Sequence, residues 1–315
     1  MKETRFATHI ALGALLAIGP LSQETAVAAL YVFGDSLSDS GNVSIASGGA
    51  NPGPDYFGGR YSNGPVWVER LATDHLGIAA PAPVMAGGTN HAWAGAFSSG
   101  GANVPSASDQ VNSFIGAGGR FVPEDTIAMW AGANDALLGG VTDPSIPVGH
   151  LVDAIGILIG ADARTILVPN LPDLGDTPAV VAMGGAAPAG MSAFSAGFNS
   201  LLAAELAGLQ LANPTISLVS VDTYGLGKDI LNDPGAFSFS NVTDPALLTG
   251  NIANADEFIY WDGVHPTGAM HELIAVRAAQ ALGVPEPSAL MLLLIGVAGV
   301  MLPRRRGAAR GRLRG

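Results

Sequence analysis

Short apolar runs alternate with longer amphipathic stretches through residues 29–283. Runs of this length and β-branched or aromatic content are typical of buried strands, whereas the amphipathic stretches have helical spacing. The predicted strands are 30–33, 126–130, 165–168, 216–221 and 257–260, and the predicted helices are 65–76, 148–159, 191–209 and 267–282. Strands that alternate with helices predict a parallel sheet covered on both faces, which is an α/β fold in one domain without an interior linker.

Residues 1–28 have the three parts of a secretory signal peptide in the right order. Two cations begin the chain, an apolar stretch covers residues 10–18, and Ala26 and Ala28 fit the small-residue site that signal peptidase cleaves. The alternative is a short buried helix. We expect export and cleavage before Ala29.

The C-terminal segment, residues 284–315, also stands apart from the domain. The sequence VPEP ends the preceding helix, and 14 uncharged residues and a cluster of Arg follow it. At ~1.5 Å per residue, 14 residues span about 21 Å, which is less than the ~30 Å hydrocarbon core of a bilayer. The Arg residues predict a tail held in the cytoplasm.

This order of VPEP, apolar helix and Arg cluster resembles the PEP-CTERM sorting signal of Gram-negative envelope proteins. The resemblance implies export across the inner membrane and transient retention by a transmembrane helix. A sorting protease then removes the helix, and the protein is released outside the cell or stays at its surface. The alternative is a permanent C-terminal anchor.

Charge and cysteine content limit the partners of the middle segment. Residues 29–287 hold six Lys and Arg against 24 Asp and Glu, a net charge of −18. Such a domain repels nucleic acid and anionic lipid surfaces, and we expect it to be a monomer. The chain has no cysteine, which excludes cysteine chemistry and cysteine-ligated metals. Only 13% of the residues are charged, which excludes a coiled coil or a disordered tail.

Polar clusters follow three of the predicted strands, where parallel sheets form their sites. Ser36 comes directly after the first strand. A serine in a strand-to-helix turn exposes its hydroxyl, as a nucleophile requires. Because Ser38 stands where a second Gly would be, the segment differs from the G-x-S-x-G elbow. The alternative role is a helix N-cap.

Asp262 and His265 follow the last predicted strand and are three residues apart. At this spacing the carboxylate can hold one ring nitrogen, which leaves the other nitrogen to accept a proton from a serine. The alternative is a solvated loop histidine.

Two further turns carry groups that could stabilise an oxyanion. Asn134 follows the strand 126–130 and could donate its side-chain amide to a developing negative charge. Gly95 has no side chain to block its own N–H. Taken separately, each could be an ordinary turn.

Together, GDSLSDSGN, the Gly of NHAWAGA, GAND and DGVH resemble, in this order, the GDSL or SGNH hydrolases. The resemblance runs from about residue 30 to 282. It implies a three-layer α/β/α sandwich with a mostly parallel, flavodoxin-like five-stranded sheet. It also implies that Ser36 is the nucleophile, His265 the base and Asp262 its orienting partner. Ser36, Gly95 and Asn134 would form the oxyanion hole.

Two further segments, RYSNGPVWVERLA and NVTDP, resemble the lipase, esterase and lysophospholipase branch of that family. Members of this branch often have Cys after NVTDP, and here the residue is Ala246. The departure implies that this loop is held differently, which affects the substrate pocket and not the chemistry.

A metal site is the main competing interpretation. Asp35, Asp39, Asp135 and Asp262 could gather near one pocket, but no ordered calcium loop occurs in the chain. His265 and His271 are six residues apart, which does not fit a helical zinc site. We therefore expect no metal and no other cofactor.

The sequence predicts an exported, metal-independent serine ester hydrolase, similar to carboxylesterases and lipases, that forms an acyl-enzyme on Ser36. One alternative is a carbohydrate O-acetyl esterase that acts on envelope or exopolysaccharide. Another, of a different class, is a surface protein that binds ligands with the same fold and has lost catalysis.

Overall fold

The computed structural model describes residues 28–101 and 103–284. Apart from Ala28 and Val284, the predicted signal peptide and the predicted sorting signal lie outside these residues, so both stay predictions. Within the described ranges, no helix is long and apolar enough to cross a membrane.

The central sheet contains four parallel strands in the order of the chain. They are β1 (Leu30–Gly34), β2 (Thr126–Trp130), β3 (Thr165–Pro169) and β4 (Ser217–Val221). Each agrees with a predicted strand to within one residue at either end. The register aligns Leu30 with Thr126, so β1 and β2 end side by side.

An irregular fifth strand lies on the outer edge of β1. The Val32 N–H donates to Thr89 O (3.0 Å), and the His91 N–H donates to Val32 O (2.7 Å). The Trp93 N–H continues this parallel pattern with a bond to Gly34 O. This edge segment, residues 89–93, therefore extends the four-stranded sheet by a fifth, irregular strand, so that β1 is second from the edge, as in flavodoxin-like folds.

The predicted strand 257–260 does not join that sheet. It forms β6 (Phe258–Tyr260), which pairs in parallel with β5 (Asn241–Pro245) in a separate two-stranded sheet. Its prediction as a strand is confirmed, but its expected place in the central sheet is wrong. The hydrogen bonds of the edge segment already occupy the free side of β1.

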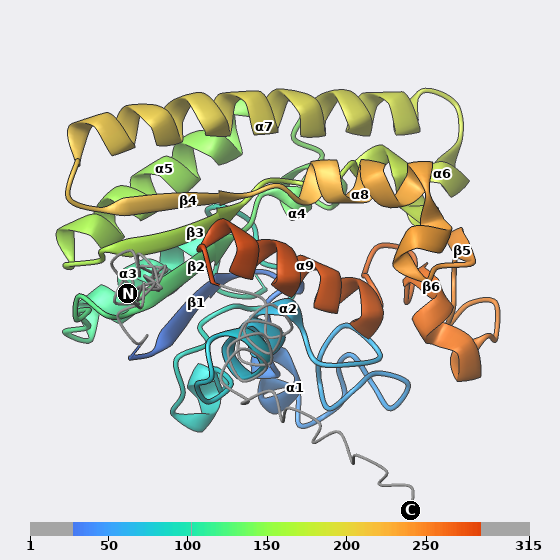
Figure 1. Ribbon diagram of the computed structural model, residues 1–315, viewed down its shortest axis with the longest axis horizontal. Coiled ribbons are helices and arrows are strands. Elements are labelled where there is room, and N and C mark those ends of the chain that lie inside the picture. Colours follow the sequence, from blue (N-terminus) through green and yellow to red (C-terminus); the bar gives the residue numbers. More distant parts are fainter. Residues whose placement is uncertain (1–27, 102, 285–315) are drawn as a thin grey trace, which may run out of the picture.

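Helices cover both faces of the central sheet and make the three layers visible in Figure 1. One face packs against α3 (Ala107–Gly116), α5 (Ser145–Gly160) and α7 (Ala187–Ala212). The other packs against α2 (Trp67–Arg70), α8 (Thr223–Asn232) and α9 (Gly268–Ala281). The predicted α/β/α sandwich is confirmed.

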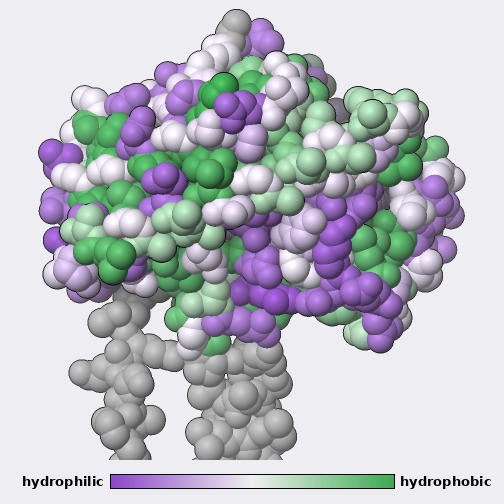
Figure 2. Space-filling model, turned by 90° about the horizontal axis from the view of Figure 1, so that it is seen from above, coloured by the Kyte–Doolittle hydropathy of each residue, from purple (hydrophilic) through white to green (hydrophobic). Residues whose placement is uncertain are grey.

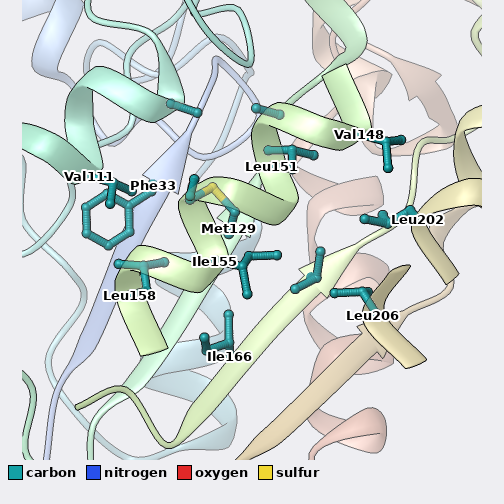
Figure 3. Packing of buried hydrophobic residues seen from close by; sticks show 14 of the residues in the cluster. Phe33, Val111, Met129, Val148, Leu151, Ile155, Leu158, Ile166, Leu202 and Leu206 are labelled. Carbon is teal, nitrogen blue, oxygen red and sulfur yellow. The ribbon is translucent and has the colours of Figure 1, made fainter. Parts of the chain in front are cut away.

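Alternation along the strands explains the two cores, because successive side chains of a strand point to opposite faces. Phe33, Met129 and Ile166 pack with α3, α5 and α7 (Figure 3). Their neighbours Val32 and Trp130 pack against the opposite helices. Both sets are almost fully buried, so the strand ends that carry the polar clusters are fixed from both sides.

Short elements connect these layers. They are α1 (Asn42–Ala46), η1 (Leu71–His75), η2 (Val84–Ala86), α4 (Ala133–Leu137), η3 (Leu174–Asp176), α6 (Pro178–Met183), η4 (Pro234–Phe237) and η5 (Ile252–Glu257). The predicted helix 65–76 is therefore α2 followed by a π-helical turn, η1. On the face seen from above α7, hydrophobic and near-neutral residues are interspersed with hydrophilic ones, consistent with the low content of charged residues (Figure 2).

Candidate active site

The turn after β1 lifts Ser36 out of the sheet. Gly34 has φ of 153°, and a Cβ at this position would collide with the Trp130 carbonyl oxygen. The Asp35 carbonyl oxygen accepts hydrogen bonds from the N–H groups of Ser38 and Asp39, both at 3.0 Å. No helix begins at Ser36, so this serine is not an N-cap.

The structure brings Ser36, His265 and Asp262 together as a hydrogen-bonded triad. His265 Nε2 lies 2.9 Å from Ser36 Oγ, and His265 Nδ1 lies 2.7 Å from Asp262 Oδ2. Ser36 is 7% exposed. The geometry is that of a nucleophile, a base and the carboxylate that orients the base.

All four acceptor positions of the Asp262 carboxylate are occupied. Oδ1 accepts the backbone N–H groups of Val264 (2.9 Å) and His265 (2.8 Å). Oδ2 accepts His265 Nδ1 and the hydroxyl of Tyr56 (2.8 Å). Burial alone would raise the pKa of Asp262, but the hydrogen bonds and charge of His265 and these N–H groups lower it to about 2. The carboxylate is therefore ionised at neutral pH.

Three predicted oxyanion donors each retain a hydrogen for a ligand. Within the residues that the structure describes, neither the Ser36 N–H nor the Gly95 N–H donates to a protein acceptor. The Asn134 amide gives one hydrogen to Ala96 O (3.0 Å), next to Gly95, and keeps its second. Gly95 has φ of 82°, a backbone conformation that side chains disfavour.

A second network holds the Asn134 turn in place. The carboxylate of Asp135 accepts both the backbone N–H (2.8 Å) and the hydroxyl (2.6 Å) of Ser98. Because Asn134 binds Ala96 and Asp135 binds Ser98, α4 is fixed to the segment that contains Gly95. Sequence reasoning did not identify Ser98.

The four carboxylates considered as metal ligands do not form a metal site. Asp39 accepts four backbone N–H groups, Asp135 binds Ser98, and Asp262 binds His265 and Tyr56. In the described part of the chain, no group of three or more acidic or histidine side chains is placed to hold a metal ion.

Asp35 and His271 are buried ionisable groups near the triad, and burial favours the neutral form of each. Burial raises the pKa of Asp35 to about 7, outweighing its hydrogen bond from the Leu37 N–H. Burial lowers the pKa of His271 to about 3, and its Nδ1 accepts the Trp67 N–H. His271 therefore supports the fold as a neutral side chain and is not a ligand.

A pocket with mostly apolar walls opens beside the triad and encloses about 100 Å³. Ser36, Asn134 and His265 lie at one part of its lining. Its apolar walls include Trp130, Leu137, Leu174, Ile259, Met270 and Ile274. The strand ends and α9 thus provide a hydrophobic surface next to the predicted nucleophile.

A charged group forms another part of the same lining. Lys228 Nζ lies 2.7 Å from both Asp173 and Asp176, and its side chain is 38% exposed. Burial would lower the pKa of Lys228, but the hydrogen bonds to these two carboxylates raise it above its usual value. The cation is therefore paired within the protein.

Residues 30–278 match the family model described as GDSL-like Lipase/Acylhydrolase. The chain belongs to this family. The match covers the triad and both oxyanion turns, and it confirms the resemblance inferred from GDSLSDSGN and the later motifs.

Relatives of known name agree with this membership. The phosphatidylcholine-sterol acyltransferase of Aeromonas hydrophila is 27% identical over 323 residues, which cover 84% of this chain and 92% of that protein. A GDSL esterase/lipase of Arabidopsis thaliana is 25% identical over 332 residues, with 85% and 91% coverage. The protein is a hydrolase of ester bonds in the GDSL esterase and lipase family.

Solved structures of similar fold include a carbohydrate acetylesterase from Sinorhizobium meliloti. It is 15% identical, has a TM-score of 0.48 and covers 81% of this chain and 98% of its own. The aryl esterase of M. smegmatis is 14% identical with a TM-score of 0.47, and the coverage is 81% and 97%.

The two segments typical of the lipase and esterase branch frame the Asp262 loop of this GDSL hydrolase. In RYSNGPVWVERLA, the Tyr61 ring lies 5.1 Å from the His265 ring, between centroids. NVTDP forms β5 beside β6, which leads into Asp262. Ala246 is fully buried with Phe258 and Trp261, so apolar packing holds this loop at the position where the resemblance led us to expect Cys.

Proposed function

We propose that this protein is an exported carboxylic ester hydrolase, similar to lipases, that works through an acyl-enzyme on Ser36. The observation that carries the proposal is the unbroken chain of hydrogen bonds from Ser36 Oγ through His265 to Asp262. The same intact chain argues against a binding protein that has lost catalysis.

In the proposed reaction, Ser36 Oγ attacks the ester carbonyl carbon while His265 Nε2 takes its proton. Asp262 holds Nδ1–H and stabilises the imidazolium that forms. The oxyanion receives hydrogen bonds from Ser36 N–H, Gly95 N–H and the Asn134 amide. His265 then protonates the leaving alcohol, the ester bond breaks, and water attacks the acyl-enzyme by the same steps.

The pocket supports an acyl group larger than acetyl. Its walls next to Ser36 are hydrophobic, and burial of each methylene there contributes about 0.8 kcal/mol to binding. An acetyl group would leave most of this surface uncovered. The names of the Aeromonas and Arabidopsis relatives, which describe acyl transfer from a phospholipid and lipase activity, agree with a lipid-like ester.

We infer export from the two chain ends. Signal peptidase would act after Ala28, and a sorting protease would act near Pro287 in the inner membrane of a Gram-negative bacterium. The protein would then be extracellular or associated with the cell surface, where a net charge of −18 on residues 29–287 favours a monomer.

The test is a panel of p-nitrophenyl esters with acyl chains from two to sixteen carbons, together with phospholipids and acetylated glycans. We expect kcat/KM to rise from acetyl towards longer chains, and Ser36→Ala to abolish every activity. Hydrolysis confined to acetyl esters would favour the carbohydrate O-acetyl esterase. Absence of any hydrolysis in the unaltered protein would contradict the proposal.

A further inference from the structure

The oxygen of Asp262 that receives His265 also receives a second side chain, which the proposed mechanism does not use. Tyr56 Oη lies 2.8 Å from Asp262 Oδ2, and His265 Nδ1 lies 2.7 Å from the same atom. Tyr56 and Asp262 are separated by 206 positions in the chain. No local motif places this hydroxyl here, so tertiary structure alone brings it to the triad.

The loop that carries Tyr56 is tied to the Asp262 loop at two further points. Ser62 Oγ donates to Pro266 O (2.8 Å), and the Gly268 N–H donates to Asn63 Oδ1 (2.8 Å). A Cβ on Gly64 would lie 3.1 Å from Gly268 Cα, so the two backbones pass very close to each other. The loop that carries Tyr56 is therefore held against the Asp262 loop by contacts other than the bond between Tyr56 and Asp262.

Aromatic packing fixes the ring of Tyr56 as well. Its centroid lies 5.9 Å from that of Tyr61 and 6.2 Å from that of Trp261. Tyr61 in turn packs against the imidazole of His265. A Phe at position 56 would keep these ring contacts and lose only the hydroxyl, which separates the two contributions.

Tyr56 remains a donor over the whole working pH range. Burial and the adjacent Asp262 carboxylate raise the pKa of Tyr56 above its usual value. A permanent donor restricts the rotation of the carboxylate and draws charge density from Oδ2. The negative charge that Oδ2 presents to His265 is thereby reduced.

We propose that Tyr56 is a positioning residue of the triad: its hydroxyl fixes the Asp262 carboxylate and moderates the pull of that carboxylate on His265. This inference rests on the proposed function. The other ionisable groups near the pair are Asp35, Asp55, Tyr61 and His271. They stay unchanged in the test below, so their contributions are common to both proteins.

The test compares Tyr56→Phe, Tyr56→Ala and a matched control, Tyr31→Phe. Tyr31 packs against Phe114 and Phe121, on the face of the sheet that is covered by α3, α5 and α7. We expect Tyr56→Phe to lower kcat by about tenfold, the scale of one hydrogen bond to a charged group, with KM nearly unchanged. The acid limb of kcat/KM should move up by about half to one pH unit, because the unshared carboxylate favours protonated His265.

Proton NMR gives a readout that packing alone would not change. The His265 Nδ1 proton should move further downfield in Tyr56→Phe, because Oδ2 then has one donor fewer. Tyr56→Ala should lose little more kcat than Tyr56→Phe. Tyr31→Phe should match the unaltered enzyme in all three measurements.

The outcomes separate this inference from the proposed function. If the unaltered protein is active and Tyr56→Phe keeps its kcat, its pH profile and its Nδ1 resonance, Tyr56 has no positioning role. If only Tyr56→Ala is impaired, the ring and not the hydroxyl is what matters, and the inference is overturned. An inactive unaltered protein would instead contradict the proposed function.

Discussion

Asp262→Asn is the substitution for which the structure dictates the outcome most completely. The backbone N–H groups of Val264 and His265 both point at Oδ1. In the variant only the amide oxygen can accept them, so the NH₂ group must take the place of Oδ2. It then donates to His265 Nδ1 and forces the ring proton onto Nε2, which faces Ser36. A ring in that tautomer cannot accept the serine proton.

The size of the effect follows from the same contact. Once His265 has taken the proton, it is an imidazolium 2.7 Å from Asp262 Oδ2. Both charges are delocalised, so the centre of the imidazolium charge and the centre of the carboxylate charge lie about 4 Å apart. At an effective dielectric constant of about 20, two unit charges at this distance attract each other by about 4 kcal/mol. Loss of this attraction in Asp262→Asn should lower kcat by about 10³-fold, and the unfavourable tautomer of His265 should lower it by roughly another factor of ten. We expect kcat to fall by 10³ to 10⁴, a loss of the size found on such a change in a serine protease triad.

The assay is p-nitrophenyl butyrate hydrolysis from pH 5 to 9, with Asp153→Asn on the exposed side of α5 as the matched control. Acid unfolding provides a second measurement. The lowered pKa of Asp262, about 2, means that its ionised form stabilises the folded state above pH 4. This contribution, about 2 kcal/mol, is lost as the pH falls towards 2 and should be absent from the variant. An Asp262→Asn enzyme with more than a tenth of normal turnover would refute the assigned orientation.

Four further predictions concern the triad, the oxyanion donors, metals and processing. Ser36→Ala and His265→Ala should each abolish hydrolysis, and the double variant should be hardly worse, because residues that act as a unit lose activity non-additively; stopped assays on folded variants check this. Asn134→Ala should lower kcat by roughly 10²–10³-fold and leave KM nearly unchanged, whereas a rise in KM alone would mean ground-state contact. Activity should survive EDTA and reducing agents and fall with a serine-directed organophosphate; loss to EDTA that Ca²⁺ restores would contradict the expectation. Intact mass of the native protein should show cuts near Ala28 and Pro287, and a membrane-bound form that keeps the C-terminal segment would mean a permanent anchor.

Much of the scaffold could be predicted because its signals are local. The apolar run over residues 126–130 predicts both ends of β2 correctly. All five of its side chains are buried, as expected for a central strand of a parallel sheet. The edge segment 89–93 gave no such signal. It contains no apolar run, and Asn90 and His91 interrupt it with polar side chains; it pairs because the β1 edge offers free backbone groups.

The candidate site divides in the same way. Ser36 and Asn134 each follow a strand of the central sheet in a recognisable turn, so their meeting at one sheet edge could be predicted. The Asp262–His265 pair follows β6, which belongs to the separate two-stranded sheet, so its contact with Ser36 was implied by the family resemblance and not by the predicted sheet. The contact of Tyr56 with this site could not be predicted, because Tyr56 lies in a loop rich in Gly and Pro whose sequence has no hydrophobic periodicity. Only the folded chain shows that this loop crosses the Asp262 loop.

The separation of the triad along the chain has a consequence for folding order. Ser36 and His265 are 229 positions apart, and the Tyr56 loop meets the Asp262 loop over a similar distance. Contacts of such high sequence separation carry a large loop-closure cost and depend on nearly the whole domain being present. A chain that is still emerging from the ribosome therefore holds its serine without the base that activates it. If the proposed triad carries the activity, ester hydrolysis requires that the last strand and α9 have docked, so an incomplete chain would be inactive.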